Sequence, residues 1–351
     1  MEYKDMILYD EPCEKSEKYR ENYYNSINKY ISNVINDAQE YRENIMESIK
    51  LEDISKLRKE YIKKLGDPLP AYSFSVPKVS KEFVAKDDLC SIYRLTFHLE
   101  IGIEFYGILC MPNNVKKPPL SIMQHGGGGT PELCMDFHGR NNYDNITKIL
   151  LEKGIAVFSP QLLLWCFSDN AVTGPNYKLE YDRRTLDMVL KQHGHSIVSL
   201  EIYCIRKAID YLSTLEEVDT EKLGMMGVSY GGLYTLYTMA ADERIQIGYS
   251  CAAFNNRVSA KRLTDYLFPY VGNSFFDAEI CTLCIPRKVL IDVGKEDSVF
   301  DYTSAVEEAE RLKKYAKRLG CEDCISFNLW EGGHRIDLNG ENLSQFINEI
   351  L

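Results

Sequence analysis

Residues 227–232 are Gly227-Val228-Ser229-Tyr230-Gly231-Gly232, and this stretch decides how the rest of the chain is interpreted. An apolar run ends at Val228, and a helical pattern begins at Leu233. A serine with a glycine two positions away on each side, between a strand and a helix, is typical of a sharp turn that exposes a nucleophilic hydroxyl. At a helix N-terminus, Ser229 would also have the positive end of the helix dipole beside it. The same short pattern arises by chance in many chains, so its weight depends on its surroundings.

A second glycine-rich stretch, His125-Gly126-Gly127-Gly128-Gly129, follows the apolar strand expected at Pro119–Gln124. Where a serine attacks an acyl group, one donor to the oxyanion is the backbone N–H after the nucleophile, here Tyr230. The other donor comes from a loop after an early strand, and we expect it at Gly127, with Gly128 as the next choice. A flexible turn and a phosphate-binding loop are the alternatives, although the Lys-Ser/Thr ending of a P-loop is missing.

A base and a carboxylate that orients it are expected after the serine. His334 is the only one of the six histidines that follows Ser229, and it lies in the turn after the last expected strand. A serine hydroxyl is a weak nucleophile until a neighbouring imidazole takes its proton. Asp297 lies in the turn after the preceding strand and is the expected partner that fixes the imidazole tautomer. The alternatives for the carboxylate are Asp292, Glu296 and Asp301.

Beyond residue 90, short apolar runs alternate with amphipathic stretches. Strands separated by helices predict an α/β fold with a mostly parallel central sheet and helices on both faces. We expect strands at 91–100, 103–111, 119–124, 155–159, 222–228, 246–251, 287–293 and 325–330. We expect helices at 145–152, 199–212, 233–241, 304–319 and 343–351.

Residues 1–70 have a different composition. From 16 to 65 the chain is polar and Tyr-rich, with apolar residues at helical spacing, which predicts two or three amphipathic helices that end at Gly66-Asp67-Pro68. We therefore predict a helical N-terminal extension over 1–70, either a cap or an oligomer contact. The catalytic domain is expected over 71–351, with insertions near 162–195 and 255–284.

The bulk composition limits the compartment and the partners. Of the 351 residues, 45% are hydrophobic and 26% are charged, and the formal net charge is -11, which argues against a nucleic-acid surface. Neither an apolar N-terminal run nor a stretch of membrane-spanning length is visible, so we expect no signal peptide and no membrane partner. Without an export signal, eleven cysteines indicate reduced thiols and a cytoplasmic protein.

Two further features admit more than one interpretation. The pairs Cys281/Cys284 and Cys321/Cys324 precede neighbouring strands and could together hold a structural Zn²⁺, but the spacing favours reduced cysteines and no metal. Trp165 follows the strand at 155–159, where it would line a substrate pocket or pack in the core.

Four motifs follow one another along the chain: the glycine loop at 125–129, the turn at Ser229, and the turns that carry Asp297 and His334. Together they resemble the motifs of the α/β-hydrolase superfamily, specifically its dienelactone-hydrolase-like and acetyl-xylan-esterase-like branch. The resemblance covers about residues 91–351 and implies ester hydrolysis through an acyl-enzyme on Ser229, with Asp297 and His334 completing a triad. It implies neither a metal nor an organic cofactor. Dienelactone hydrolases carry a cysteine nucleophile, so the serine here favours an esterase.

Three functions remain open from the sequence. A carboxylic-ester hydrolase leads, with a small-molecule ester as its substrate, for example an acetyl ester of a carbohydrate. The motif around Ser229 is also similar to that of prolyl-oligopeptidase-type peptidases, but the N-terminal extension is too short for their β-propeller. A non-catalytic binding protein is the third possibility, and the complete triad argues against it. If the N-terminal extension is an oligomer contact rather than a cap, its helices would join copies of the chain in a homo-oligomer.

Overall fold

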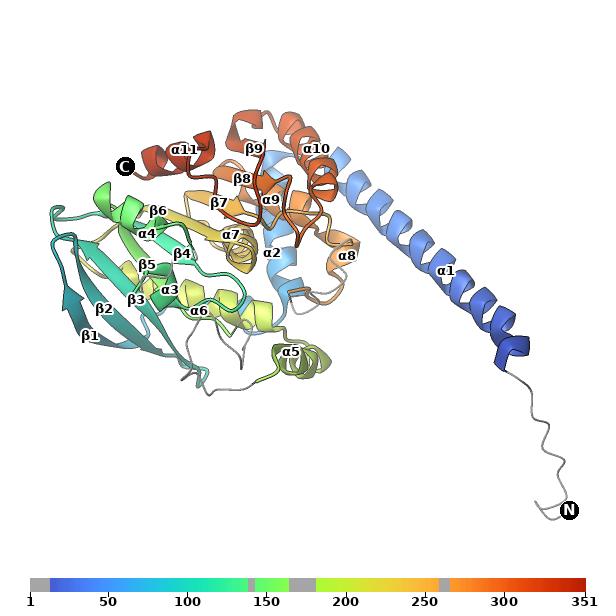
Figure 1. Cartoon of the computed structure of the whole chain (residues 1–351), viewed down its shortest axis with the longest axis horizontal. Helices are drawn as coiled ribbons and strands as arrows, with labels where there is room; N and C mark the ends of the chain where they lie inside the picture. Colours follow the sequence, from blue (N-terminus) through green and yellow to red (C-terminus); the bar gives the residue numbers. More distant parts are fainter. Residues whose placement is uncertain (1–12, 138–142, 164–180, 259–265) are drawn as a thin grey trace, which may run out of the picture.

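The computed structural model describes residues 13–137, 143–163, 181–258 and 266–351 (Figure 1). Within them the chain forms a nine-stranded sheet in the order β1-β2-β3-β5-β4-β6-β7-β8-β9. The strands on the β1 side pair antiparallel up to β5, and the pairs from β5 through β4 to β9 are parallel. The strands are β1 (Lys78–Lys86), β2 (Cys90–His98), β3 (Glu104–Pro112), β4 (Pro119–Gln124), β5 (Ala156–Pro160), β6 (Asp219–Val228), β7 (Ile247–Cys251), β8 (Lys288–Gly294) and β9 (Ile325–Trp330).

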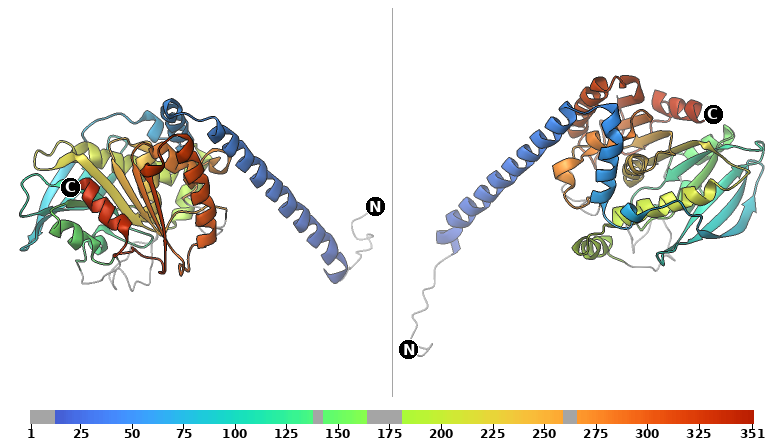
Figure 2. Two further views of the ribbon diagram at one scale, coloured as in Figure 1. Left: turned by 90° about the horizontal axis from the view of Figure 1, so that it is seen from above. Right: turned by 180° about the vertical axis from the view of Figure 1, so that it is seen from behind.

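Helices cover both faces of this sheet (Figure 2). One apolar cluster joins the sheet to α4 (Ile146–Glu152) and α11 (Glu341–Ile350). A larger cluster joins the other face to α6 (Ile197–Leu212), α7 (Tyr230–Ala241), α9 (Asp277–Cys284) and α10 (Tyr302–Arg318). The remaining helices are α1 (Cys13–Glu47), α2 (Ile54–Leu65), α3 (Pro131–Cys134), α5 (Arg183–Gln192) and α8 (Val271–Ser274).

The expected strands are all present, with boundaries shifted by up to three residues. β1 was not predicted, and its nine residues explain why, because each is exposed or half-buried and three are lysines. Among the described strands it pairs with β2 alone, and charged side chains are typical of such an edge strand. The helices α5, α8 and α9 lie within the ranges 162–195 and 255–284, where we expected insertions.

Between residues 13 and 70 the chain forms two α-helices, and the second belongs to the main core. In α2, Tyr61 and Leu65 are fully buried within the larger cluster. The Tyr61 hydroxyl donates to the Tyr237 carbonyl oxygen at 3.1 Å, and Arg58 donates to two carbonyl oxygens on α7 and α9. No helix in the described ranges has an apolar stretch of the length that crosses a bilayer.

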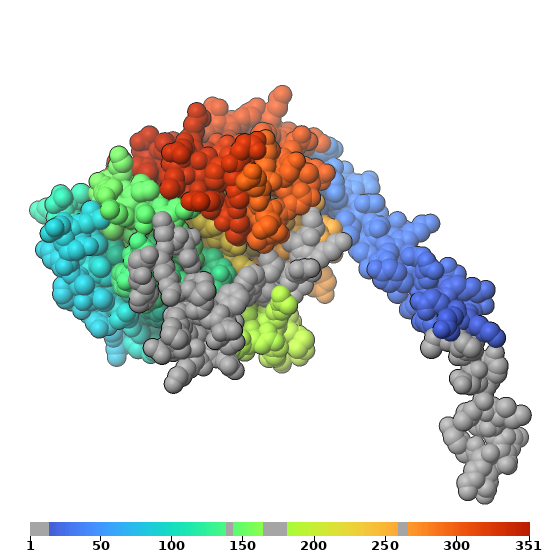
Figure 3. Space-filling model, viewed as in Figure 1, coloured from blue at the N-terminus to red at the C-terminus, as the bar shows by residue number. Residues whose placement is uncertain are grey.

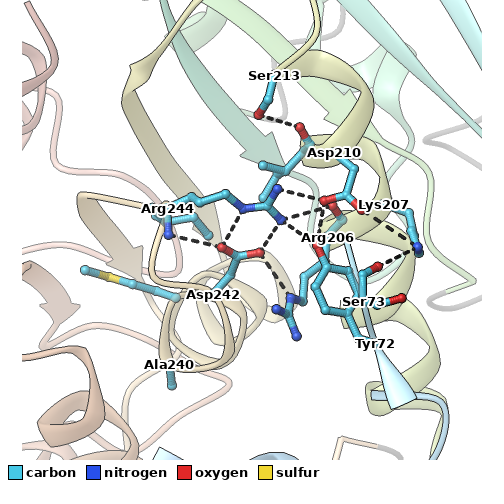
Figure 4. Close-up of polar contacts among 12 residues, drawn as sticks. Tyr72, Ser73, Arg206, Lys207, Asp210, Ser213, Ala240, Asp242 and Arg244 are labelled. Atoms are coloured by element: carbon cyan, nitrogen blue, oxygen red, sulfur yellow. Dashed lines mark hydrogen bonds and ion pairs between the residues drawn. The ribbon is translucent and has the colours of Figure 1, made fainter. Parts of the chain in front are cut away.

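A buried polar cluster fixes the chain between α2 and β1 against α6 (Figure 4). The fully buried Lys207 donates to the Ser73 carbonyl oxygen at 3.0 Å, and the Tyr72 hydroxyl donates to Asp210 at 2.5 Å. Arg244 bridges Asp210 and the carboxylate at the end of α7. The cluster pairs its charges almost completely, as buried charges require. It therefore anchors the start of the sheet domain to the helical layer.

Candidate active site

Ser229 occupies a strained turn between β6 and α7. Its φ of 60° and ψ of -123° lie outside the regions that a serine ordinarily adopts. The turn is tight, because a Cβ on Gly231 would lie 2.0 Å from the carbonyl oxygen of Gln124. The Ser229 N–H donates to the Cys251 carbonyl oxygen on β7 at 2.9 Å, which fixes the turn to the neighbouring strand. This is the backbone geometry predicted for a nucleophile elbow.

The glycine loop after β4 lies directly against this turn. A Cβ on Gly126 would lie 3.4 Å from the Ser229 Cβ, and one on Gly129 would lie 2.2 Å from the Tyr143 hydroxyl. The Gly126 N–H donates to that hydroxyl at 2.8 Å, and the Gly129 N–H donates to the Gly126 carbonyl oxygen at 3.0 Å. Two of the four glycine N–H groups are thereby occupied.

The other two N–H groups, those of Gly127 and Gly128, have no acceptor within the described part of the chain. Gly127 is half-buried and Gly128 is buried, so Gly127 is the more accessible. Tyr230 is the first residue of α7, at the positive end of that helix. The structure therefore places the predicted oxyanion donors on the two segments that flank Ser229.

His125 holds the start of the glycine loop as a neutral group. Its Nδ1 lies 3.0 Å from the Gly126 carbonyl oxygen, and its Nε2 accepts the Leu162 N–H at 3.1 Å. Since Nε2 is an acceptor, the proton is on Nδ1. Complete burial lowers the pKa of His125 to about 4, so the ring is uncharged at neutral pH. This histidine joins the β4 loop to the chain that follows β5.

Asp297 and His334 are directly hydrogen bonded. His334 Nδ1 lies 2.8 Å from Asp297 Oδ2, and the Asp297 side chain is 1% exposed. Asp297 Oδ1 accepts the N–H groups of Val299 and Phe300 at 2.7 and 3.1 Å, so both carboxylate oxygens have donors. With Nδ1 bound to the carboxylate, Nε2 is the nitrogen left to exchange a proton with a reactant.

Among the described residues, none of the three alternative carboxylates is hydrogen bonded to His334. Asp292 is fully buried on β8, where Tyr249 and Asn342 donate to it, and burial raises its pKa. Asp301 caps the N-terminus of α10 by accepting the Thr303 N–H. Glu296 is exposed.

The loops of the site meet at one edge of the sheet. Ser229, Asp297 and His334 follow β6, β8 and β9, and the glycine loop follows β4. These strands belong to the parallel part of the sheet, so their carboxyl ends share an edge. Arg335 also donates to both oxygens of Asp144, the residue after Tyr143. The histidine loop is therefore tied to the segment that supports the glycine loop.

A cavity of about 450 Å³ lies beside the acid loop. It is lined mainly by polar side chains, among them Asn255, Lys295, Ser298 and Tyr302. Phe300 also lines it, and the Phe300 ring is 5.8 Å from the His334 ring, centroid to centroid. Asp297 itself lines the cavity, which therefore adjoins the acid loop.

Two supporting residues were missed in the sequence. Tyr143 supports Gly126 from 17 positions further along the chain, and no local motif indicates that pairing. Arg183, at the start of α5, is buried and binds Glu201 with two hydrogen bonds of 2.8 and 3.0 Å. It also donates to the Tyr234 hydroxyl and lies 5.8 Å from the Tyr230 ring centroid. Only the tertiary fold brings these groups behind the nucleophile turn.

Two sequence hypotheses concern residues away from the triad. Cys281 and Cys284 are buried in α9, whereas Cys321 and Cys324 lie half-buried in the connection before β9. Among the described residues, no three His, Cys, Asp or Glu side chains converge to hold a metal ion. Trp165 lies outside the described residues.

Comparison with known proteins shows which sequences and folds this chain is similar to. No family model matches the sequence. YtaP of Bacillus subtilis (strain 168), whose name assigns it to the hydrolases provisionally, is 28% identical over 153 residues, 40% of this chain and 50% of YtaP. "Acetyl esterase Axe7A" of Xylanibacter ruminicola is 24% identical over 205 residues, 58% of this chain and 43% of Axe7A. The chain thus spans about half the length of the curated relatives it matches.

Solved structures share the fold. Acetyl xylan esterase 1 from Thermoanaerobacterium sp. JW/SL YS485 superposes with a TM-score of 0.57 at 16% identity, over 85% of this chain and 94% of that one. A glucuronoyl esterase from Solibacter usitatus gives a TM-score of 0.61 at 13% identity, over 86% and 91% of the two chains. The predicted α/β-hydrolase fold is confirmed, as is the predicted resemblance to acetyl xylan esterases.

Proposed function

We propose that this protein is a serine hydrolase that cleaves a carboxylic ester through an acyl-enzyme on Ser229. The observation that carries the proposal is the 2.8 Å bond between His334 Nδ1 and Asp297 Oδ2, on the same sheet edge as the strained serine. That bond leaves His334 Nε2 as the base and gives the buried carboxylate an orienting role. The sequence similarity to a protein named as an acetyl esterase supports the same reaction class.

The mechanism follows from these positions. Ser229 Oγ attacks the ester carbonyl carbon while His334 Nε2 takes the hydroxyl proton, and Asp297 stabilises the imidazolium. The carbonyl oxygen, now an oxyanion, accepts hydrogen bonds from the N–H groups of Tyr230 and of Gly127 or Gly128. The alcohol leaves with the proton from His334. Water, deprotonated by the same imidazole, then attacks the acyl carbon and releases the acid and Ser229.

For the substrate we propose a small polar ester, such as an acetyl ester of a carbohydrate. The polar cavity beside the acid loop, which Asp297 lines, supports a hydroxyl-bearing alcohol group. The acetyl xylan esterase with the same fold is consistent with an acetyl group. The proteins named above are esterases and a hydrolase, so none of them favours the peptidase alternative.

We propose the cytoplasm as the compartment. Nine cysteines in the described ranges are free thiols, and seven of these are buried. A reducing compartment keeps such thiols unpaired.

The test compares the wild type with the Ser229→Ala variant. We expect a fluorophosphonate probe to label the wild type only, and we expect p-nitrophenyl acetate to be hydrolysed faster than longer acyl esters. An unlabelled wild type would overturn the serine mechanism. If the protein hydrolyses aminoacyl amides and no esters, the proposed esterase activity is wrong and the protein is a peptidase.

A further inference from the structure

The first helix projects from the body of the protein. With 35 residues at about 1.5 Å each, α1 is about 50 Å long. Figures 1 and 3 show that most of it extends away from the sheet domain. Only its last turns are anchored: Arg42 and Met46 are buried, and Arg42 lies 4.2 Å from the Phe276 ring centroid. Most residues from 14 to 34 are exposed.

This exposed part carries an apolar stripe. Tyr24, Ile27, Ile31 and Val34 are 66%, 39%, 47% and 45% exposed. The stripe continues toward the body through Ala38, Tyr41 and Ile45, so that the spacing alternates between three and four residues throughout. That alternation is the a/d pattern of a coiled coil, in which two helices pack along a 3.5-residue repeat.

The helix has little intrinsic stability. Residues 22–36 include five asparagines and four β-branched apolar residues, both weak helix formers. Isolated helices in water are marginal even with good helix formers, and most helices depend on packing of an apolar face. A projecting α1 therefore requires a second surface along its stripe.

The charge pattern identifies that surface as a second copy of this chain. Residues 22–36 contain one charged residue, Lys29, in a chain of net charge -11. A helix that lies on a membrane has several Lys and Arg on its polar face, whereas the polar face here consists of Asn and Ser with Lys29 as the one basic residue. A coiled-coil helix that selects a different partner by charge has charged residues at the e and g positions beside its apolar stripe. Here those positions are occupied by uncharged residues: Tyr23, Asn28, Tyr30 and Ile35. Two acidic chains can approach each other where they are uncharged.

We propose that two copies of this protein dimerise through an antiparallel coiled coil of their α1 helices. Centred on residue 29, such a pair places Tyr24 of each copy against Val34 of the other, and Ile27 against Ile31. Large side chains then face smaller ones, and the two bodies lie at opposite ends. A parallel pair would stack Tyr24 on Tyr24 and bring two acidic bodies together.

The antiparallel register also continues onto the body. A groove of about 500 Å³ lies between α1, α2 and α8, and it includes Ala38, Tyr41, Glu60 and Lys64. In this register the partner's first turns, which carry Glu17 and Arg20, reach the groove. The groove carries Asp37, Glu60 and Lys64, so charges of both signs are present on each of the two surfaces.

Light scattering coupled to size-exclusion chromatography tests the proposal on the full chain. We expect the wild type to have twice the 40.4 kDa mass of one chain, and the Ile27→Glu/Ile31→Glu variant to have the mass of one. The Asn25→Glu/Ser32→Glu variant adds the same charge to the outer face and should stay dimeric. A wild type that is monomeric at 100 µM would overturn the proposal. Equal masses for the Ile27→Glu/Ile31→Glu and Asn25→Glu/Ser32→Glu variants would overturn it as well.

Small-angle X-ray scattering of the wild type tests the orientation. An antiparallel pair gives two separated maxima in the distance distribution, one within each body and one between bodies. A dimer whose bodies lie side by side would overturn the antiparallel register. Hydrolysis of p-nitrophenyl acetate should be unchanged in both variants, because the described site residues all lie outside α1.

Discussion

Two buried carboxylates lie five positions apart at the end of β8, and their surroundings differ. Asp292 is surrounded by neutral donors from β7, β9 and α11, whereas Asp297 faces His334. Asp297 also accepts hydrogen bonds from two backbone N–H groups, so donors fix the orientation of both of its carboxylate oxygens. Burial raises the pKa of Asp292, which disfavours its ionised form.

Replacing the two carboxylates separately should separate catalysis from stability. We expect Asp297→Asn to lower kcat about 10⁴-fold with little change in KM, because the wrong imidazole tautomer is then favoured. Asp292→Asn should leave kcat within about threefold and lower the free energy of unfolding by about 1–3 kcal/mol. Initial-rate kinetics and urea unfolding measure both. If Asp292→Asn shows the larger fall in kcat, the assignment of the acid to Asp297 fails.

Tyr143 is a positioning residue for the oxyanion loop. Tyr143→Phe leaves the buried Gly126 N–H without its acceptor, which costs about 1–3 kcal/mol and favours a shift of the glycine loop. We therefore expect kcat to fall about 10- to 100-fold while KM changes little, since the loop acts on the transition state.

The matched control is Tyr61→Phe, which removes a similar buried hydroxyl hydrogen bond on α2. It should lower the melting temperature and leave kcat unchanged. Equal kcat values for both Tyr→Phe variants would show that Tyr143 has a merely structural role.

The sequence could predict part of the site because the order of the elements determines it. His334 and Asp297 could be named from their positions after the last two expected strands, since adjacent parallel strands end at one edge. Tyr143 and Arg183 could not be predicted, because each acts through contacts across the fold rather than through a local pattern.

At the level of elements, His125 makes the junction between β4 and β5 sensitive to pH. Its pKa is about 4 in the folded protein and 6.5 in an ordinary environment. Between these values the unfolded chain binds more protons than the folded one, so stability falls as pH decreases. The stability that depends on His125 being neutral is fully present above pH 6.5 and is lost progressively toward pH 4. The difference corresponds to about 3 kcal/mol.

Urea unfolding at pH 7 and at pH 4.5 measures this effect. We expect the His125→Gln variant to be less stable than the wild type at pH 7 but to lose less stability on acidification. His193→Gln, at an exposed histidine, should keep the wild-type dependence on pH. If His125→Gln and the wild type lose the same free energy, the buried neutral histidine is not the cause.

The elements themselves differ in how well the sequence predicts them. Strand β4 is buried throughout, and strand β9 is half-buried with alternating apolar and polar residues; the predicted bounds of both match the observed ones. The exposed edge strand β1 lacks such a pattern, because its pairing with β2 rather than burial holds it in place. Helix α5 has only two buried residues, Arg183 and Asp187, and both are charged.

At the scale of the whole molecule, the two N-terminal helices differ in how they pack on the sheet domain. The sequence predicted a boundary at residue 70, where the composition changes. In the structure, Ile54, Tyr61 and Leu65 of α2 lie in the same apolar cluster as α7 and α9. Helix α1, in contrast, contributes only Met46 to that cluster.

Two truncations test this difference. Removing residues 1–40 should leave a folded, active monomer, since the deleted part of α1 lies almost entirely in solvent. Removing residues 1–70 exposes the surfaces under Ile54, Tyr61 and Leu65, and full burial of each such side chain contributes about 1.5–3 kcal/mol. The sum is comparable to the whole stability of a typical domain, so residues 71–351 alone should not fold cooperatively. Circular dichroism melting and p-nitrophenyl acetate hydrolysis distinguish the two chains. A stable, active 71–351 chain would show that the hydrolase domain is independent of α2, as the composition alone suggests.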